Sequence, residues 1–241
     1  MLGLGNSLSR GGVPSAGFST QSVSFDGTND YVAIGDVHDI SADADFSLSL
    51  WIKTSESGNY GTLVGKGRFS GTLERYALYY HGSVGRLNLC DGSASGKDLG
   101  SSTSIVDGEW HHILGTFDRS DDMTIYIDGT SEGTLDISAQ NGSLVPGDSY
   151  DDFVICGGQS GLTYSQALID EVSIFNTIVS VGDLRDGSKP ADLTDISGLV
   201  GWWRMGDGTE AASGTTIYDM STNSNNGTLT NGPTYSTDVA A

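Results

Sequence analysis

The sequence predicts an all-β fold, a two-sheet antiparallel β-sandwich or jelly roll, and three observations support this prediction. Apolar residues alternate with polar ones at a period of two, as they do along a strand with one buried face. Asp-Gly and Asn-Gly pairs separate the alternating runs and favour tight hairpin turns. The chain has 241 residues, among them 35 glycines, and few stretches with helical periodicity. Many short strands joined by such turns are typical of an antiparallel sandwich.

The clearest alternating runs are FSLSLWIK at residues 46–53, MTIYIDG at 123–129 and VSIF at 172–175. In the first run Phe46 and Leu48 point to one face, and the serines beside them point to the other. Each run has the length of an ordinary strand and is rich in β-branched or aromatic residues. We therefore expect each of these runs to form a strand with one face in the core.

Two local features lie outside this pattern. Ser180 can cap a short helix at 180–184, with Asp183 three residues later as in a capping box. Cys90 and Cys156 lie in apolar, strand-like runs. We expect two buried thiols there, and a disulfide between them is the alternative.

The composition narrows the class of partner. The chain has 31 acidic residues against 11 basic ones, which gives a formal net charge of -20. Nucleic acid is disfavoured, because phosphate binding needs clustered Lys and Arg. An acidic surface instead suits solubility, divalent cations or a cationic partner. No apolar run reaches the ~18 residues of a membrane-spanning helix, so no membrane insertion is expected.

Six segments carry a resemblance to a known family. In chain order they are FDGTNDYV (25–32), FSLSLWIKT (46–54), LVGKG (63–67), EWHHILGTFD (109–118), YIDG (126–129) and LIDEVSIFN (168–176). The ordered set resembles laminin-G-like jelly rolls of the concanavalin A-like superfamily and covers roughly residues 22–180. The resemblance implies the same two-sheet sandwich that the alternation predicts.

The C-terminal segment GLVGWWRMGDG with TTIYDMSTNSNNGTLTNGPTY is similar to the segment that usually precedes the FDG strand in this family. It is either the start of a truncated second repeat or a segment that completes the same sandwich. Only about 40 residues follow Gly198, too few for a second sandwich. We therefore expect an N-terminal arm at 1–20 and one sandwich at 21–241, with 198–241 completing it.

The resemblance also implies a structural calcium ion near the first turn. The matching positions are Asn29, Asp30 and Asp170, with the Gly27 carbonyl as a further ligand and Asp26 as a weaker candidate. Calcium takes about six to eight oxygen ligands, including carboxylates, amides and carbonyls. If Asp170 shares the core face of its strand, an ionised carboxylate there needs a cation or several donors. The alternative is that the turn residues only shape an Asx-type turn.

No catalytic arrangement is expected. Glycoside hydrolases of this superfamily use a Glu-x-Asp-x-x-Glu strand, whose two carboxylates flank the scissile bond. This spacing is missing from the sequence, where Asp170 and Glu171 are adjacent and point to opposite faces of a strand. His111 and His112 are also adjacent, so their rings point to opposite faces and do not form a paired site.

We expect a non-catalytic virion protein that serves in capsid decoration or in tail or fibre adhesion. The chain lacks the basic start and apolar stretch of an export signal. Its opening, MLGLGNSLSRGG, resembles the short Gly-rich starts of tail and capsid accessory proteins of marine bacteriophages. The expected partners are other virion proteins, cell-surface glycans or a second copy of the chain.

The alternative is a secreted or surface-exposed carbohydrate-binding, lectin-like module in the extracellular space. Carbohydrate recognition uses an exposed aromatic face with polar groups beside it. Tyr60, Tyr79 and Trp202 are the candidate ligand-binding residues. Trp202 and Trp203 are adjacent on a predicted strand and so point to opposite sides.

Overall fold

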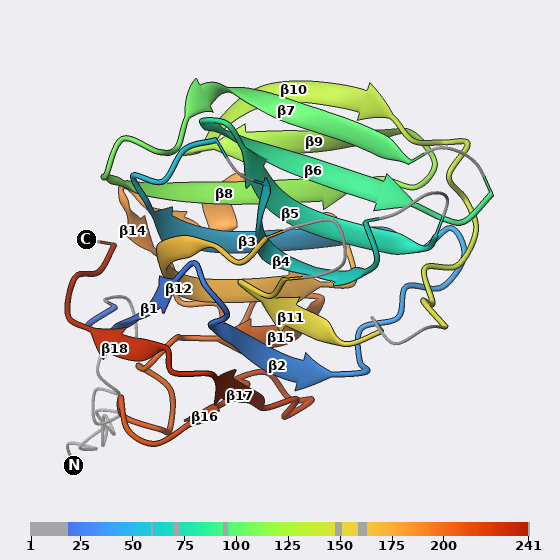
Figure 1. The fold of residues 1–241 in the computed structure, drawn as a ribbon. Coiled ribbons are helices and arrows are strands. Elements are labelled where there is room, and N and C mark those ends of the chain that lie inside the picture. Colours follow the sequence, from blue (N-terminus) through green and yellow to red (C-terminus); the bar gives the residue numbers. More distant parts are fainter. Residues whose placement is uncertain are drawn as a thin grey trace, which may run out of the picture.

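The computed structural model describes residues 19–58, 60–69, 73–93, 96–147, 151–158 and 163–240. The predicted arm at 1–20 therefore lies outside the described residues except for Ser19 and Thr20. Two antiparallel sheets pack face to face, and the hydrophobic core lies between them (Figure 1). The predicted two-sheet β-sandwich is confirmed.

Sheet A carries the strands whose alternation is clearest in the sequence. From one edge to the other it runs through β10 (Thr130–Asp136), β9 (Asp122–Ile127), β8 (Trp110–Phe117), β3 (Phe46–Lys53), β12 (Gln166–Phe175), β1 (Ser22–Asp26) and β18 (Thr234–Ser236). Outside this order, β15 (Leu199–Trp203) also pairs with β12. The strands that flank β12 thus come from both ends of the chain.

Sheet B faces it across the core. Its order is β16 (Thr216–Ile217), β17 (Gly227–Thr230), β2 (Tyr31–Gly35), β11 (Phe153–Ile155), β4 (Tyr60–Gly67), β5 (Arg75–His81), β6 (Val84–Cys90) and β7 (Lys97–Ser104). A small hairpin, β13 (Arg185–Asp186) and β14 (Lys189–Pro190), follows the 3-10 helix η1 (Val181–Asp183). Ser180 caps η1 as the sequence predicts, its hydroxyl accepting a hydrogen bond from the Gly182 amide.

The core forms from the alternating faces of the two sheets. On β3 the buried positions include Phe46 and Leu50, and on β5 they include Tyr76 and Tyr80. Phe46 stacks on Phe117 of the neighbouring strand, with ring centroids 4.3 Å apart. Each such side chain contributes about 1.5–3 kcal/mol when it leaves water. Cys90 and Cys156 are both buried, and no disulfide joins them.

The C-terminal segment contributes strands to both sheets. Strand β17 pairs with β2, β18 with β1, and β15 with β12. In Figure 1 the red C-terminal strands β17 and β18 accordingly lie beside the blue strands β2 and β1. Trp203 at the end of β15 is fully buried and packs against Phe153, with ring centroids 5.7 Å apart. The core between the sheets therefore depends on residues beyond position 198.

Within the described residues, no helix has the length and apolar character needed to cross a membrane.

We expect Trp203→Ala to lower the free energy of unfolding by ~3–5 kcal/mol, because it leaves a large cavity in the core. Urea denaturation of the variant and of the wild-type protein measures this difference. Val145→Ala is the control, since Val145 is 48% exposed and its change costs less than ~0.5 kcal/mol. An equal loss in both variants would contradict the role assigned to the C-terminal segment.

Candidate functional site

A row of aromatic rings lies on the outer face of sheet B. Tyr76 and Tyr80 of β5 enter the core, so alternation turns Tyr79 and His81 to the outer face. Tyr60 pairs with His81 across β4 and β5, and their rings stack with centroids 3.8 Å apart and planes 7° apart.

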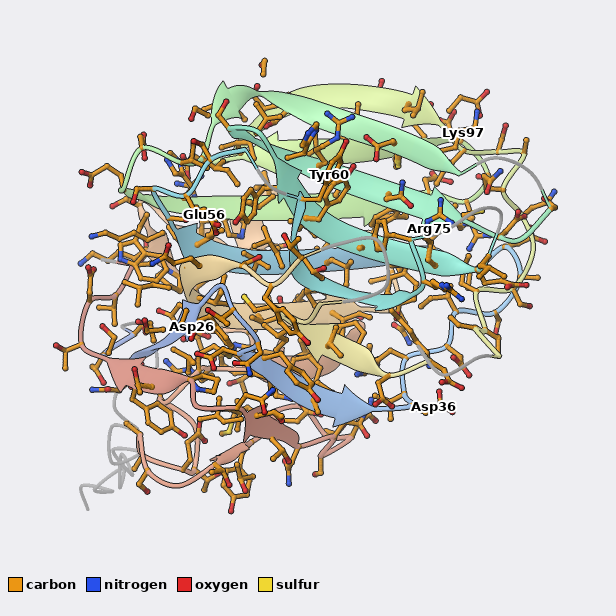
Figure 2. All side chains as sticks on the ribbon, in the orientation of Figure 1. Asp26, Asp36, Glu56, Tyr60, Arg75 and Lys97 are labelled. Atoms are coloured by element: carbon orange, nitrogen blue, oxygen red, sulfur yellow. The ribbon has the colours of Figure 1, made fainter. Side chains whose placement is uncertain are left out.

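Tyr79 lies next along this row. Its ring is stacked with that of Tyr60 at 6.4 Å, and Phe69 meets it edge-on at 5.6 Å. Phe69, Tyr79, Tyr60 and His81 are called the aromatic row below. Figure 2 labels Tyr60 over the strands of sheet B that face the viewer.

A network of polar side chains centred on Asp98 adjoins the aromatic row. Arg86 donates from Nε to Asp98 Oδ1 (2.7 Å) and to the Tyr79 hydroxyl oxygen (3.1 Å). The Tyr79 hydroxyl in turn donates to Asp98. Asn88 donates to Asp98 Oδ2 (3.1 Å) and accepts from Arg75 Nε (2.8 Å). Because these groups hold one another, they keep their positions before any ligand arrives.

The two tyrosines of the row have different roles. Tyr60 is 46% exposed, so a large part of its side chain is open to solvent. Tyr79 is 3% exposed and lies beneath it. Burial, followed by the hydrogen bond to Asp98, raises the pKa of the Tyr79 phenol, which therefore stays neutral and donates to Asp98. Tyr60 is thus the exposed ring of the pair, and Tyr79 is the buried ring stacked with it.

Trp202, the third predicted ligand-binding residue, departs from the expectation. Its side chain is in the interior, at 3% exposure, in a second apolar cluster with Leu114 and Phe175. Its Nε1 donates to Glu171 Oε2 (2.6 Å), and Arg204 Nε donates to Glu171 Oε1 (2.9 Å). Both faces of β15 are covered in this fold, so neither tryptophan of the pair is available to a ligand.

The predicted calcium ligands of the first turn lie together. The Asp26 carboxylate accepts from the Thr28 amide (2.7 Å), and the Asp30 carboxylate accepts from the Asp26 amide (3.2 Å). Gly27 has φ 74°, and a Cβ there would lie 2.9 Å from the side chain of Gln166. The Asn29 backbone carbonyl accepts a hydrogen bond from the side-chain Nδ2 of Asn231 (2.8 Å). The turn is thus closed by its own hydrogen bonds, as in the Asx-turn alternative.

Asp170 lies apart from this turn. In the β1–β12 register Gln166 is opposite Asp26, and Asp170 is four residues further along β12. At ~3.3 Å per residue the separation is ~13 Å, too far for one ion to bind both. The structure therefore does not bring Asp170 together with Asn29 and Asp30.

The surroundings of Asp170 are unusual for a carboxylate. Its side chain is fully buried, and neither oxygen makes a well-formed hydrogen bond to a described residue, although the Ser19 hydroxyl and the Glu171 amide lie close enough to lower its pKa. Burial raises its pKa, and the neighbouring charge of Glu171 adds to this effect. Among the described residues no group of three or more His, Cys, Asp or Glu side chains is arranged to hold a metal ion. Any cation at Asp170 must therefore draw most of its ligands from other oxygens.

A bulge in β12 explains why the sequence misplaces Asp170. The pairing with β3 shifts between Asp170 and Ser173, and Glu171 has φ 48°. Ile169 and Val172 both enter the core, so unbroken alternation does not hold here. The expected shared face of Asp170 with Val172 is therefore wrong.

The adjacent histidines have separate surroundings. His111 lies between Asp128 (2.6 Å from Nδ1) and Asp107 (3.0 Å from Nε2). The hydrogen bond to Asp128 raises the pKa of His111. His112 is fully buried against Ser49, and burial lowers its pKa to about 3. The two rings do not form a paired site.

Sequence reasoning missed most residues of the site on sheet B, among them His81, Arg86 and Asp98. The alternation from Tyr79 to His81 could have identified the first. Arg86 and Asp98 meet only because β6 and β7 pair in one register, with Asn88 opposite Asp98. The sequence contains no local signal for that register.

Known proteins that are similar to this chain have the same β-sandwich fold. The family model described as the concanavalin A-like lectin/glucanases superfamily matches residues 26–185. A solved structure from Bacteroides ovatus, described as a candidate carbohydrate binding protein, is 19% identical with a TM-score of 0.67. The match covers 93% of this chain and 61% of the chain of the Bacteroides ovatus protein.

Domains LG4-5 of the mouse laminin α1 chain are 14% identical with a TM-score of 0.53. The match covers 68% of this chain and 44% of that one. This chain therefore spans less than two thirds of either structure. At these identities the likeness shows the fold. A search of the curated proteins found no match.

We expect the His111 contacts to stabilise the protein at low pH. A raised pKa means that the folded state holds the proton more tightly than the unfolded chain does. The stabilisation is therefore full below the ordinary value of 6.5 and is lost as the pH rises through the folded pKa. The difference in free energy of unfolding between wild type and His111→Gln should shrink as the pH rises above 6.5 and through the raised folded pKa. NMR titration should meanwhile show no charge change at His112, and a difference that grows with pH would contradict the assignment.

Proposed function

Because the chain belongs to the concanavalin A-like lectin/glucanase superfamily, we propose that it is a glycan-binding module without catalytic activity. The observation that carries the proposal is the exposed ring of Tyr60 beside the fixed pair Arg86 and Asp98. An aromatic face with a few oriented polar groups is the arrangement that recognises a sugar ring. The description of the Bacteroides ovatus protein as a candidate carbohydrate binding protein supports the same class of ligand.

The geometry suggests how a sugar would bind. The apolar face of the ring lies on Tyr60, which His81 backs by stacking. Hydroxyl groups at the rim of the sugar reach Arg86 and Asp98, which offer a donor and an acceptor beside the ring. Since these side chains are already held in the network, binding orders few of them and loses little conformational entropy.

The positions of the carboxylates support the absence of catalysis. Glycoside hydrolysis needs two carboxyl groups on either side of the bond, about 5–9.5 Å apart and open to the substrate. Asp170 and Glu171 are both buried, and Glu171 is bound to Trp202 and Arg204. Asp98 beside the aromatic row is held by Arg86 and Tyr79. None of these three carboxylates is placed as a free acid or nucleophile.

A structural calcium ion at Asp170 is a second part of the proposal. A fully buried carboxylate with no well-formed hydrogen bond costs several kcal/mol when ionised, and a cation removes most of that cost. Ser19 and Asp207 both lie near Asp170, where the Ser19 hydroxyl lowers the pKa of Asp170 and the Asp207 charge raises it. The turn with Asn29, Asp30 and Gly27 is not part of this site.

The virion surface, on capsid or tail, is proposed as the setting of this binding on the resemblance of residues 1–12 alone. In that setting the partners are other virion proteins and the glycans of a cell surface. Mass spectrometry of purified particles tests the setting. Recovery of the chain only from the medium or the cell surface would favour the secreted lectin-like module.

Tyr60→Ala should weaken glycan binding by about tenfold or more, since an aromatic contact and its buried area are lost. Tyr60→Phe should keep most of the affinity because the ring remains. A glycan array identifies the ligand, and isothermal calorimetry then measures the three affinities. Tyr218→Ala removes another exposed tyrosine, at 36% exposure, and should change nothing. Unchanged affinity in Tyr60→Ala would remove the aromatic row from the proposal.

Millimolar calcium should raise the melting temperature of the metal-stripped wild-type protein and leave that of Asp170→Asn unchanged. In chelator the variant should be the more stable protein at pH 8, and its advantage should fall at low pH. The reason is that the raised pKa lets Asp170 take up a proton as the pH falls, which removes the buried charge.

Asp30→Asn is the matched control for this experiment. It alters the first turn and should respond to calcium as the wild type does. Loss of the calcium response in Asp30→Asn, with a normal response in Asp170→Asn, would place the ion at the turn instead.

A further inference from the structure

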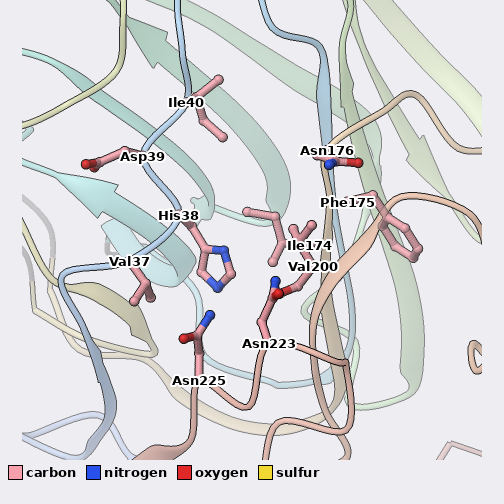
Figure 3. A pocket seen from close by; sticks show the side chains of 10 residues that line it. All are labelled: Val37, His38, Asp39, Ile40, Ile174, Phe175, Asn176, Val200, Asn223 and Asn225. Carbon is pink, nitrogen blue, oxygen red and sulfur yellow. The ribbon is translucent and has the colours of Figure 1, made fainter.

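A pocket of about 470 Å³ lies apart from the aromatic row and shares no residue with it (Figure 3). One wall is the loop at 37–40 between β2 and β3, and another is the end of β12 at 174–176. The C-terminal segment closes it with Val200, Asn223 and Asn225. The volume is within the ~300–1,000 Å³ of pockets that hold small molecules.

The loop at 37–40 is held rigidly from the interior. Lys66 is fully buried, and its ammonium group contacts the carboxylates of Asp36 and Asp39, each at 2.6 Å. The Tyr76 hydroxyl donates to the His38 carbonyl (2.5 Å). Breaking a buried ion pair of this kind leaves an uncompensated charge, so the loop keeps its shape.

His38 occupies a strained position on this loop. Its φ is 61°, a region that residues other than glycine rarely adopt. Its ring is fixed edge-on against Phe153 and Trp203, with centroids 5.0 and 5.7 Å apart. Burial lowers the pKa of His38 to about 4, so the ring is neutral near pH 7. Strain that the surroundings maintain is typical of binding sites.

The loop on the opposite wall is held in the same manner. The Asn225 amide donates to the Asp219 carboxylate (2.8 Å), and its carbonyl accepts from Trp203 Nε1 (2.9 Å). The residue before it, Ser224, has φ 57°. The backbone of Asn225 is therefore fixed while its side chain remains free to point into the pocket.

Three side-chain amides belong to residues that line the pocket. Those of Asn176 and Asn225 make no hydrogen bond to any other residue that the structure describes, although both line the pocket. Asn223 donates from Nδ2 to the Val200 carbonyl (2.8 Å), which leaves its Oδ1 as an acceptor. In Figure 3 the amides of Asn223 and Asn225 lie beside the His38 ring. The pocket thus offers donors and acceptors on a rigid frame.

The chemistry of this lining selects an uncharged ligand. Amides pair with hydroxyl groups, which both donate and accept. Ile174 and Val200 supply an apolar wall, and Lys66, which also pairs with Asp36, compensates part of the charge of Asp39. A chain with a net charge of -20 repels anions. A pyranose ring, with hydroxyls at its rim and apolar faces, has the matching properties.

We propose that this pocket is a second carbohydrate site, which takes one uncharged sugar ring between the amides of Asn176, Asn223 and Asn225. The proposal extends the glycan binding proposed above, but it uses different residues. The two sites can therefore fail separately.

Amide NMR of the full chain tests the proposal, with glucose, galactose, mannose and N-acetylglucosamine added one at a time. At least one sugar should shift the side-chain amide signals of Asn176, Asn223 and Asn225 together with the signals of His38. Asn225→Ala and Asn176→Ala should each weaken this binding by about fivefold, as expected for the loss of one hydrogen bond. Neither side chain bonds to a residue that the structure describes, so both variants should fold.

Two controls separate the sites. Asn141→Ala removes an exposed asparagine that does not line the pocket and should leave the sugar response unchanged. Tyr60→Ala should also leave the shifts at the pocket unchanged, even where it abolishes binding at the aromatic row. Shifts confined to the aromatic row, or no shift at the three asparagines with any sugar, would overturn the second site. Equal weakening by Asn141→Ala and Asn225→Ala would overturn it as well.

Discussion

The backbone hydrogen bonds between the C-terminal segment and strands β1, β2 and β12 join the two ends of the described chain. They bring Trp203 between the sheets and place the Asp207 carboxylate on the amides of Thr20 and Gln21. The sandwich core and the pocket with Asn225 both depend on this pairing. A contact so distant in sequence is entropically costly to form, and the apolar area that it buries offsets that cost.

In both proposed sugar sites the ligand-binding groups are held in place before binding, but different contacts hold them. In the aromatic row a stacked pair, Tyr60 and His81, presents one open ring beside a fixed network. In the pocket, buried contacts of Lys66 and Asp219 hold two loops so that free amides line a hollow. Both arrangements spend little conformational entropy on binding, because the interior of the protein has already fixed the groups that touch the ligand.

Asp170 marks the point where local and long-range constraints conflict. The bulge at Glu171 inserts a residue into β12 and turns both acidic side chains out of the regular alternation. Glu171 accepts hydrogen bonds from Trp202 and Arg204, whereas Asp170 makes no well-formed hydrogen bond to a described residue. Natural proteins rarely keep a buried carboxylate without a donor, a proton or a cation, because its desolvation is so costly. A cation at this position would also tie β12 to the residues around Ser19 and Asp207.

The sequence by itself determined the fold class and its main strands, including 46–53 and 123–127, because strand alternation is a local property that needs no partner. It also excluded the paired carboxylates of a glycoside hydrolase, since a fixed spacing on one strand is equally local. The tertiary structure decided the rest. The register of β1 on β12 separated Asp30 from Asp170, and the covering of both faces of β15 removed Trp202 from the surface. These outcomes depend on which distant segments pair and where a bulge shifts them, and alternation along one strand contains no information on either.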